Sequence, residues 1–179
     1  MKILICSDIH GSLFFTKKLQ EIIKKEEPNK IIILGDLYYH GPRNPLTEEY
    51  NPMEVAKILN NLKENLIVIK GNCDAEVDEM ISEFPMHEYY VMEINGKKIF
   101  FTHGHKWNKE NQPEEKFDIL VYGHFHTGFI EEENNKIFLN PGSISLPKNG
   151  TENSYAIITE NEILLKNLNG KIIKKLDID

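Results

Sequence analysis

Short apolar runs, each followed at once by a polar turn, recur along this chain and constrain its fold more than any other feature. Residues 2–6, 31–34 and 66–69 lead into the turns SDIHG, GDL and GNCD, and two later runs lead into THGH and YGHFH. Compact apolar runs of this kind, bounded by turn residues, are typical of buried strands. The pattern therefore predicts several buried strands whose ends all carry polar side chains.

The segments between the first three runs have helical features. Ser12 is a candidate N-cap, apolar residues then recur at helical spacing, and Pro28 ends the segment. Asn51 and Pro52 predict the cap and first turn of a second helix, and a short helix is expected over residues 75–82. Strand, helix, strand is the unit from which parallel sheets are built.

The second half of the chain is predicted to be mostly β-structure. Asn95-Gly96 is a strong hairpin signal, and residues 131–136 are expected to form a charged turn. The whole pattern predicts one domain over residues 1–179 of the α/β class, a four-layer α/β/β/α sandwich of two mixed sheets flanked by helices. The expected later strands span residues 89–94, 99–102, 119–122, 129–130, 137–139, 154–159, 162–167 and 171–177.

Charge and composition exclude several classes of partner. The net charge of −7 argues against binding to DNA, RNA or anionic membranes, because binding to a phosphate backbone needs a basic surface. No apolar run approaches the roughly 20 residues of a membrane span, and the first apolar run is too short for a signal peptide. Two cysteines, Cys6 and Cys73, do not make a disulfide framework. We therefore expect a soluble cytoplasmic protein.

The polar turns supply seven side chains that can bind divalent cations. Asp8 and His10 are two residues apart, so in extended backbone they face the same side, and His124 and His126 repeat that spacing. Each motif alone is weak evidence, because GD is a common turn and GHxH is often a surface histidine pair. Together, seven ligands suit two ions with a bridging water, and Asp36 can bridge them with its two oxygens. The candidate ligands are Asp8, His10, Asp36, Asn72, His103, His124 and His126.

The order of these motifs resembles the calcineurin-like metallophosphoesterase superfamily, and within it the small bacterial YfcE-like phosphodiesterases. The stretches SDIHGSL, GDLYYHGPRNP, GNCDAEVDEM, THGH, YGHFH and NPGSISLPK carry the resemblance over most of the chain. It implies two divalent metal ions, with Mn²⁺ as the first choice and Fe²⁺, Zn²⁺ or Ni²⁺ as alternatives. It assigns Asp8, His10, Asp36 and His126 to the first ion. It assigns Asp36, Asn72, His103 and His124 to the second.

Cys73 departs from the pattern of the superfamily. Most members have a histidine after the asparagine, which is thought to protonate the leaving group, whereas cysteine at this position resembles the YfcE-like branch. A thiol, with a reference pKa of about 8.5, is a weaker acid than imidazolium. Asp36, Asn72 and Cys73 are the predicted catalytic residues, and a covalent mechanism with Cys73 as the nucleophile stays an alternative.

Residues that could contact the substrate lie mainly in the long loop between 37 and 52. Arg43 is the only arginine in the chain, and its planar guanidinium suits a phosphate group. We expect Arg43 or His40 near the substrate, with the alternative that Arg43 pins its own loop. His105 is expected beside the metal-bound His103, where it would orient that histidine or contact substrate. The turn 140–145 is expected to donate hydrogen bonds near the metals.

The predicted function is a metal-dependent phosphodiesterase that hydrolyses a small phosphate ester by attack of a metal-bridging hydroxide. A protein-binding scaffold of the same fold, similar to a retromer subunit, is the alternative. A nuclease is a third hypothesis, which the acidic charge balance opposes. The expected partner is a small phosphate ester, without nucleic acid or membrane, and self-association of the chain is left open.

Overall fold

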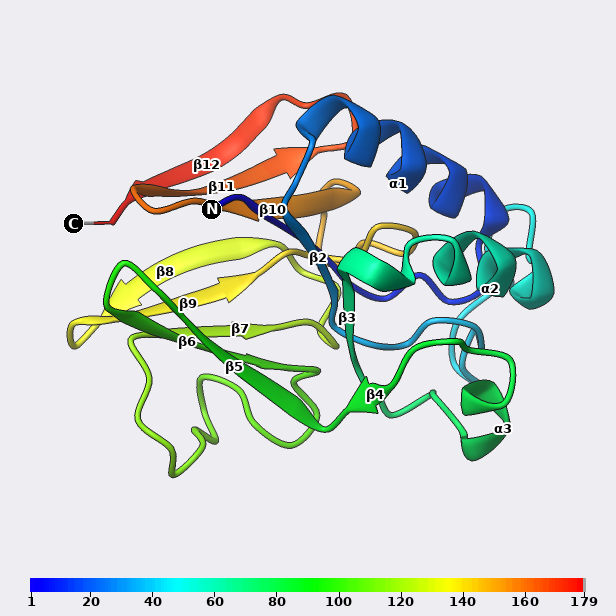
Figure 1. Cartoon of the computed structure of the whole chain (residues 1–179), viewed down its shortest axis with the longest axis horizontal. Coiled ribbons are helices and arrows are strands. Elements are labelled where there is room, and N and C mark those ends of the chain that lie inside the picture. The colour runs from blue at the N-terminus through cyan, green and yellow to red at the C-terminus, as the bar shows by residue number, and fades with distance from the viewer. Residues whose placement is uncertain (179) are drawn as a thin grey trace.

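Two mixed β-sheets face each other in the computed structural model, which describes residues 1–178, and helices cover the outer side of one of them (Figure 1). In spatial order, the seven-stranded sheet contains β12 (Ile172–Asp177), β11 (Glu162–Asn167), β10 (Ser154–Ile158), β1 (Ile3–Cys6), β2 (Lys30–Ile33), β3 (Leu66–Ile69) and β4 (Met86–His87). The five-stranded sheet contains β5 (Tyr89–Ile94), β6 (Lys97–Thr102), β7 (Ile119–Tyr122), β9 (Lys136–Asn140) and β8 (Phe129–Glu133).

The predicted strand–helix–strand unit is confirmed at the centre of the larger sheet. β1, β2 and β3 are parallel neighbours, and α1 (Leu13–Glu26) connects the first two. The backbone N–H of Phe15 donates to the Ser12 hydroxyl at 3.3 Å, which confirms the predicted N-cap. α2 (Pro52–Asn60) begins at the predicted proline, and the backbone N–H of Glu54 donates to the Asn51 side chain at 3.3 Å.

Side chains that alternate along the strands build the layers. Leu4 and Cys6 of β1 pack toward α1 and α2, whereas Ile3 and Ile5 pack between the two sheets against residues such as Phe101. Both faces of β1 are therefore buried, which explains its continuous apolar sequence. Cys6 is fully buried and acts as an apolar core residue.

The sandwich of two mixed sheets is confirmed, but its fourth layer differs from the expectation. Within residues 1–178, the outer face of the five-stranded sheet is covered by the loop between β6 and β7 rather than by a helix. Trp107 and Phe117 of that loop pack on Phe100, Leu120 and Phe138. The loop is polar and lacks apolar residues at helical spacing, so it has no amphipathic face with which to form a helix.

Some predicted boundaries were wrong. Glu131–Glu133 belong to β8 and pair with β9, so the turn is not residues 131–136 but Asn134 and Asn135, both in the left-handed region with φ of 52° and 61°. β8 is an edge strand, and its exposed glutamates are stable there because they remain in water. The helix expected over 75–82 is shorter, α3 (Glu76–Glu79), and a 3₁₀ turn, Lys63–Asn65, precedes β3.

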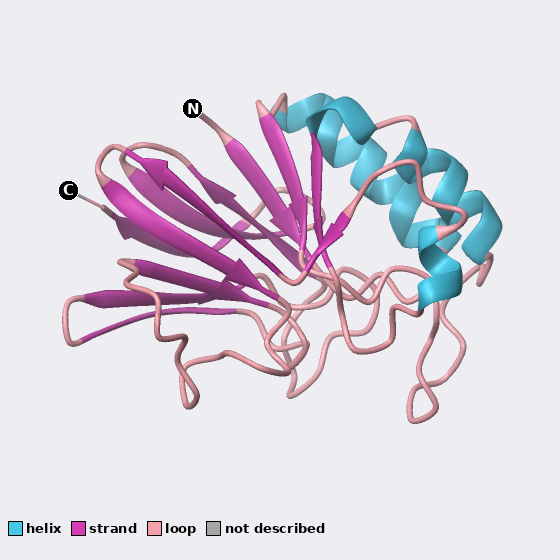
Figure 2. Cartoon of the chain, turned by 60° about the horizontal axis from the view of Figure 1, so that its bottom comes forward, coloured by secondary structure: helices cyan, strands magenta, loops and turns pink. Residues whose placement is uncertain are grey.

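The central strands of both sheets run into one cluster of loops, which Figure 2 shows below the strands. β1, β2 and β3 end there, and so do β6 and β7. Carboxyl ends of strands are the usual place for ligand sites in such sheets. Nowhere in the stretch from residue 1 to 178 is a helix both long and apolar enough to cross a bilayer.

Candidate metal centre

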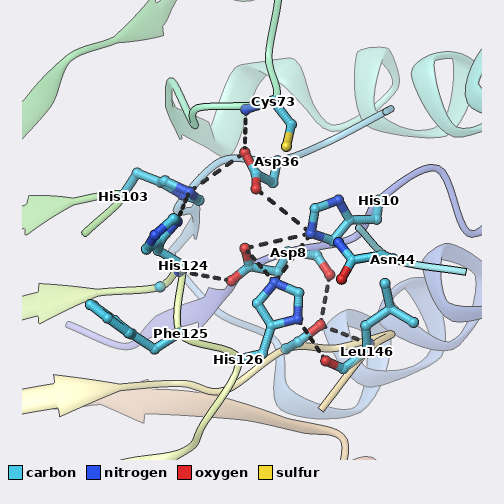
Figure 3. A network of polar contacts seen from close by, with 12 residues as sticks. Asp8, His10, Asp36, Asn44, Cys73, His103, His124, Phe125, His126 and Leu146 are labelled. Carbon is cyan, nitrogen blue, oxygen red and sulfur yellow. Dashed lines mark hydrogen bonds and ion pairs between the residues drawn. The ribbon is translucent and has the colours of Figure 1, made fainter. Parts of the chain in front are cut away.

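Five loops bring all seven candidate ligands into one cluster, and Figure 3 shows the aspartates and histidines among them. Those from the larger sheet follow β1, β2 and β3, and those from the smaller sheet follow β6 and β7. The centre therefore lies across the boundary between the two sheets. The larger sheet contributes Asp8, His10, Asp36 and Asn72, and the smaller sheet contributes His103, His124 and His126.

One half of the cluster surrounds His10 and His126. Asp8 Oδ1 lies 3.3 Å from His126 Nε2 and 3.8 Å from His10 Nε2. Asp36 Oδ2 lies 3.6 Å from His10 Nε2. These four side chains are almost completely buried, so a cation between them would be shielded from water on most sides.

The other half of the cluster surrounds His103. Its Nε2 lies 3.5 Å from Asp36 Oδ1, 3.0 Å from Asn72 Oδ1 and 3.3 Å from His124 Nδ1. The two oxygens of Asp36 thus face different halves, Oδ2 toward His10 and Oδ1 toward His103. This arrangement is the one that a bridging carboxylate requires.

Backbone carbonyls fix the tautomers of three histidines. The Nδ1 atoms of His10, His103 and His126 lie 2.6–2.7 Å from the carbonyl oxygens of Tyr39, Leu34 and Leu146. A carbonyl can only accept, so each Nδ1 must carry the proton and donate it. In the neutral ring, the lone pair then lies on Nε2, which points into the cluster.

Without a cation, these polar atoms are poorly satisfied. Asp8 Oδ1 is buried and has no hydrogen-bond partner among residues 1–178, and the Nε2 atoms of His10 and His126 face each other at 3.2 Å. Buried polar atoms are rarely left unpaired, and a cation would satisfy all three at once. The carboxylate, amide and imidazole donors suit Mn²⁺, Fe²⁺ or Zn²⁺. The residues present therefore fit a divalent metal site.

The cluster also shifts the pKa values of its histidines. Burial alone would lower the pKa of His103, but its contact with Asp36 and the charges of Asp8 and Asp36 raise it to about 9. Burial and the neighbouring His103 lower the pKa of His124 to about 4. His103 must therefore lose a proton before it can bind a cation near neutral pH, whereas His124 is already neutral.

Five of the ligands have a left-handed backbone conformation, which residues other than glycine rarely adopt. This conformation costs energy and persists only where surrounding contacts enforce it. Residues with φ between 50° and 64° include Asp8, His10, Asp36, His124 and His126.

Asp74 makes some of the contacts that hold this backbone in place, and its role was not predicted from the sequence. Its Oδ2 accepts from the backbone N–H groups of Asp36 at 2.8 Å and Gly71 at 2.7 Å, and its Oδ1 accepts from Leu37 N–H at 2.8 Å. One buried carboxylate therefore holds both the loop with Asp36 and the loop with Asn72. Its place in GNCD, beside a candidate ligand, was the available signal.

The turn at 140–145 was predicted to donate hydrogen bonds near the cluster, and this is confirmed. The hydroxyls of Ser143 and Ser145 both donate to the carbonyl of Asp8 at 2.8 Å. The side-chain amide of Asn140 donates to the Gly123 carbonyl at 2.8 Å, just before His124. These bonds hold the loops after β1 and β7 in place.

A pocket of about 460 Å³ opens above the cluster. Five of the candidate ligands line its floor, and its walls come from the loop after β2, the loop after β3 and the loop after β9. The five are His10, Asp36, Asn72, His124 and His126. The wall residues are Tyr39, Gly41, Pro42, Arg43, Asn44, Cys73 and Lys148.

The three predicted substrate-binding residues lie in different places. Arg43 lines the pocket. His40 packs against Tyr39 and Tyr50, with ring centroids 4.7 Å and 5.5 Å away, and it does not line the pocket. His105 is exposed with its ring centroid 5.3 Å from that of His103, but it makes no hydrogen bond among residues 1–178. The Leu34 carbonyl, rather than His105, orients His103.

Comparison with known proteins identifies the family. A family model described as the calcineurin-like phosphoesterase superfamily domain matches residues 1–162. The chain is a calcineurin-like phosphoesterase. Its family membership confirms the predicted resemblance and the hydrolysis of phosphoric esters, and it implies divalent metal ions.

Several relatives resemble this calcineurin-like phosphoesterase over most of its length. A curated relative, Phosphodiesterase YfcE of Escherichia coli strain K12, is 40% identical over 166 residues, which cover 92% of this chain and 90% of the relative. A solved structure of the E. coli phosphoesterase Yfce aligns over 100% of both chains with a TM-score of 0.96 and 37% identity. Vps29 of Entamoeba histolytica, at 23% identity and a TM-score of 0.70 over 100% of both chains, shares the fold.

In this calcineurin-like phosphoesterase, Cys73 lies at the edge of the cluster. Its backbone N–H donates to Asp36 Oδ1 at 2.9 Å, and its sulfur lies within 4.8 Å of ligand atoms of His10 and Asp36. Without a cation nearby, burial and the Asp36 carboxylate raise the pKa of the thiol to about 12. A thiol that keeps its proton is a poor nucleophile, which weighs against the covalent alternative.

Proposed function

We propose that this chain is a metal-dependent phosphodiesterase that hydrolyses a small phosphate ester at a centre of two divalent cations. The observation that carries the proposal is the position of Asp36, whose two oxygens face two separate groups of ligands. The similarity to Phosphodiesterase YfcE supports a diester as the substrate. Mn²⁺ is the first choice of metal, with Fe²⁺, Zn²⁺ and Ni²⁺ as alternatives.

Each cation has its own set of ligands, with Asp36 shared. When bound, such a pair lowers the pKa of a water molecule and offsets the charge that develops on the phosphoryl oxygens. The first set would be Asp8, His10, Asp36 and His126, and the second Asp36, Asn72, His103 and His124.

The chain itself supplies the proton for the leaving group. The thiol of Cys73 lies on the pocket wall beside the cluster, and we assign it the role of proton donor to the departing oxygen. Because its pKa is high, it is a weak acid, so esters whose leaving groups need little protonation should react fastest. Aryl diesters should therefore be better substrates than alkyl diesters.

The test combines metal content with turnover. Elemental analysis should find two equivalents of divalent metal per chain, and bis(para-nitrophenyl) phosphate should be hydrolysed with Mn²⁺ but not after treatment with a chelator. Asp36→Asn should lose both properties. Asp78→Asn is the matched control, because Asp78 lies outside the cluster and only caps α3. One equivalent of metal in a fully active enzyme would refute the dinuclear centre.

A protein-binding scaffold is the competing hypothesis. The likeness to Vps29 shows the fold alone, and the complete ligand set in this chain favours an enzyme. A folded protein that hydrolyses no ester with Mn²⁺, Fe²⁺, Zn²⁺ or Ni²⁺ would favour the scaffold instead. A nuclease is opposed by the net charge of −7. A cytoplasmic location and self-association stay predictions.

A further inference from the structure

Two cationic side chains of the pocket have no acidic partner. Arg43 and Lys148 both line it, and neither forms an ion pair or a side-chain hydrogen bond within residues 1–178. Lysines elsewhere on the surface are often paired, as Lys106 is with Glu88 and Lys109 with Glu131. In a chain with a net charge of −7, two unpaired cations in one pocket indicate that an anion binds there.

Arg43 is not needed to hold its own loop. The backbone N–H of Asn44 bonds to the Gly41 carbonyl at 3.4 Å, and its side-chain amide donates to the His40 carbonyl at 2.8 Å. These bonds close the turn 41–44 without the arginine side chain. A Cβ on Gly41 would lie 3.4 Å from Cys73 Sγ, so this turn lies beside the proposed proton donor.

The backbone of Lys148 is held at the His126 end of the cluster, whereas the turn 41–44 lies at the Cys73 end. Its backbone N–H donates to the His126 carbonyl at 2.9 Å, and its own carbonyl accepts from the Thr151 hydroxyl at 2.8 Å. Figure 3 shows Cys73 and His126 at opposite ends of the cluster, with Asp36 and Asp8 between them. An ester arm that departs past Cys73 would therefore leave the other arm on the side of Lys148.

Charge counting indicates that a simple diester leaves one positive charge in the pocket unmatched. Two divalent cations would bring four positive charges, and three carboxylates would offset three of them: those of Asp8, Asp36 and Asp74, which bonds to the Asp36 backbone. The phosphodiester and a deprotonated nucleophile bring two negative charges, one more than the cations would have left. Arg43 and Lys148 add two positive charges, so the sum is +1, which one further anionic group on the substrate would match.

We propose that the substrate is a phosphodiester whose retained arm carries a second anionic group, a carboxylate or a further phosphate, which Lys148 and Arg43 bind. This inference rests on the proposed phosphodiesterase function and names the class of its substrate. Lys148 is the main contact because it lies on the side of the retained arm. Arg43, in the turn 41–44, adds a planar guanidinium that can donate two hydrogen bonds to the same anionic group.

A matched pair of substrates tests the proposal. Para-nitrophenyl carboxymethyl phosphate and para-nitrophenyl carbamoylmethyl phosphate have the same leaving group and similar size, but only the first has a charged retained arm. We expect a kcat/KM about five-fold higher for the charged arm, which corresponds to about 1 kcal/mol, the upper value for an exposed ion pair. Lys148→Gln should abolish this preference and Arg43→Gln should reduce it.

Lys174→Gln is the control, because Lys174 is an exposed lysine on β12, away from the pocket, and forms no ion pair with any residue from 1 to 178. Binding of the two products, carboxymethyl phosphate and carbamoylmethyl phosphate, measured by calorimetry, gives a second readout that needs no turnover. Equal kcat/KM values for both substrates, or a preference that survives in Lys148→Gln, would overturn the inference and leave the proposed function intact. Failure to hydrolyse either substrate would count against the proposed function, while product binding would still test Lys148.

Discussion

Asp74 offers the sharpest test of how the loops hold the metal ligands. Its carboxylate accepts three backbone hydrogen bonds, two on Oδ2 and one on Oδ1. In Asp74→Asn, the remaining oxygen can keep the bonds to Asp36 and Gly71. The new amide group then faces the N–H of Leu37, which loses its acceptor.

The magnitude follows from these three bonds. A buried donor left without an acceptor costs about 1–3 kcal/mol. The two bonds that remain lose the assistance of the charge, which makes such bonds roughly twice as strong as neutral ones. Burial and Asp36 raise the pKa of Asp74, so the charge itself is unfavourable there, and its removal offsets part of this cost. We expect Asp74→Asn to lower the free energy of unfolding of the metal-free protein by about 2 kcal/mol, mainly through the unpaired N–H of Leu37. Loss of such a supporting partner typically weakens metal affinity about 10–100-fold.

Urea unfolding with a chelator and Mn²⁺ titration calorimetry measure the two effects. Burial and the nearby Asp36 raise the pKa of Asp74 to about 6, so both assays belong well above that pH, where the carboxylate is charged. Asp78→Asn is the control, because Asp78 accepts one exposed hydrogen bond, from Ala75, and should cost only about 1 kcal/mol. If Asp74→Asn bound Mn²⁺ as tightly as the wild type, the positioning role would be refuted.

Three further predictions concern the candidate metal centre. Gly71→Ala places a Cβ 2.1 Å from Asp36 Oδ1 and should abolish Mn²⁺ binding, whereas Gly96→Ala, with nothing within 4 Å, should leave the affinity unchanged. Cys73→Ser should keep near-normal turnover of aryl diesters, and Cys73→His should accelerate alkyl esters more than aryl ones; equal gains would contradict the role as a weak acid. Because the pKa of His103 is about 9, Mn²⁺ binding near neutral pH should release a proton, seen as an enthalpy that varies with the ionisation heat of the buffer.

The sequence was sufficient to predict the three parallel strands at the centre of the larger sheet and the ligand cluster, because both depend on local patterns. It did not predict that β10, β11 and β12 join that sheet, or that β4 forms its edge. Apolar runs that end in Asp8, Asp36 and Asn72 mark parallel strands, and the carboxyl ends of such strands meet at one edge. The caps at Ser12 and Asn51 follow in the same way from the residue types that accept backbone hydrogen bonds.

Features that depend on tertiary contacts could not be predicted. The loop over the smaller sheet owes its place to Trp107 and Phe117, whose packing has no periodic signature. His105 follows a ligand in sequence, but His103 is oriented by the carbonyl of Leu34, a residue 69 positions earlier in the chain. Lys148 closes the stretch NPGSISLPK, but only the fold places it on the pocket wall.

The position of the centre across the two sheets couples the hydrophobic interior to the chemistry. Ile5 and Phe101 pack between the sheets, and the strands that carry them, β1 and β6, end just before Asp8 and His103. A cavity made by trimming either side chain would let the sheets shift relative to each other and alter the spacing of the ligands. Conservative substitutions in the interior, far from the substrate, should therefore lower the turnover rate of a protein that is still fully folded.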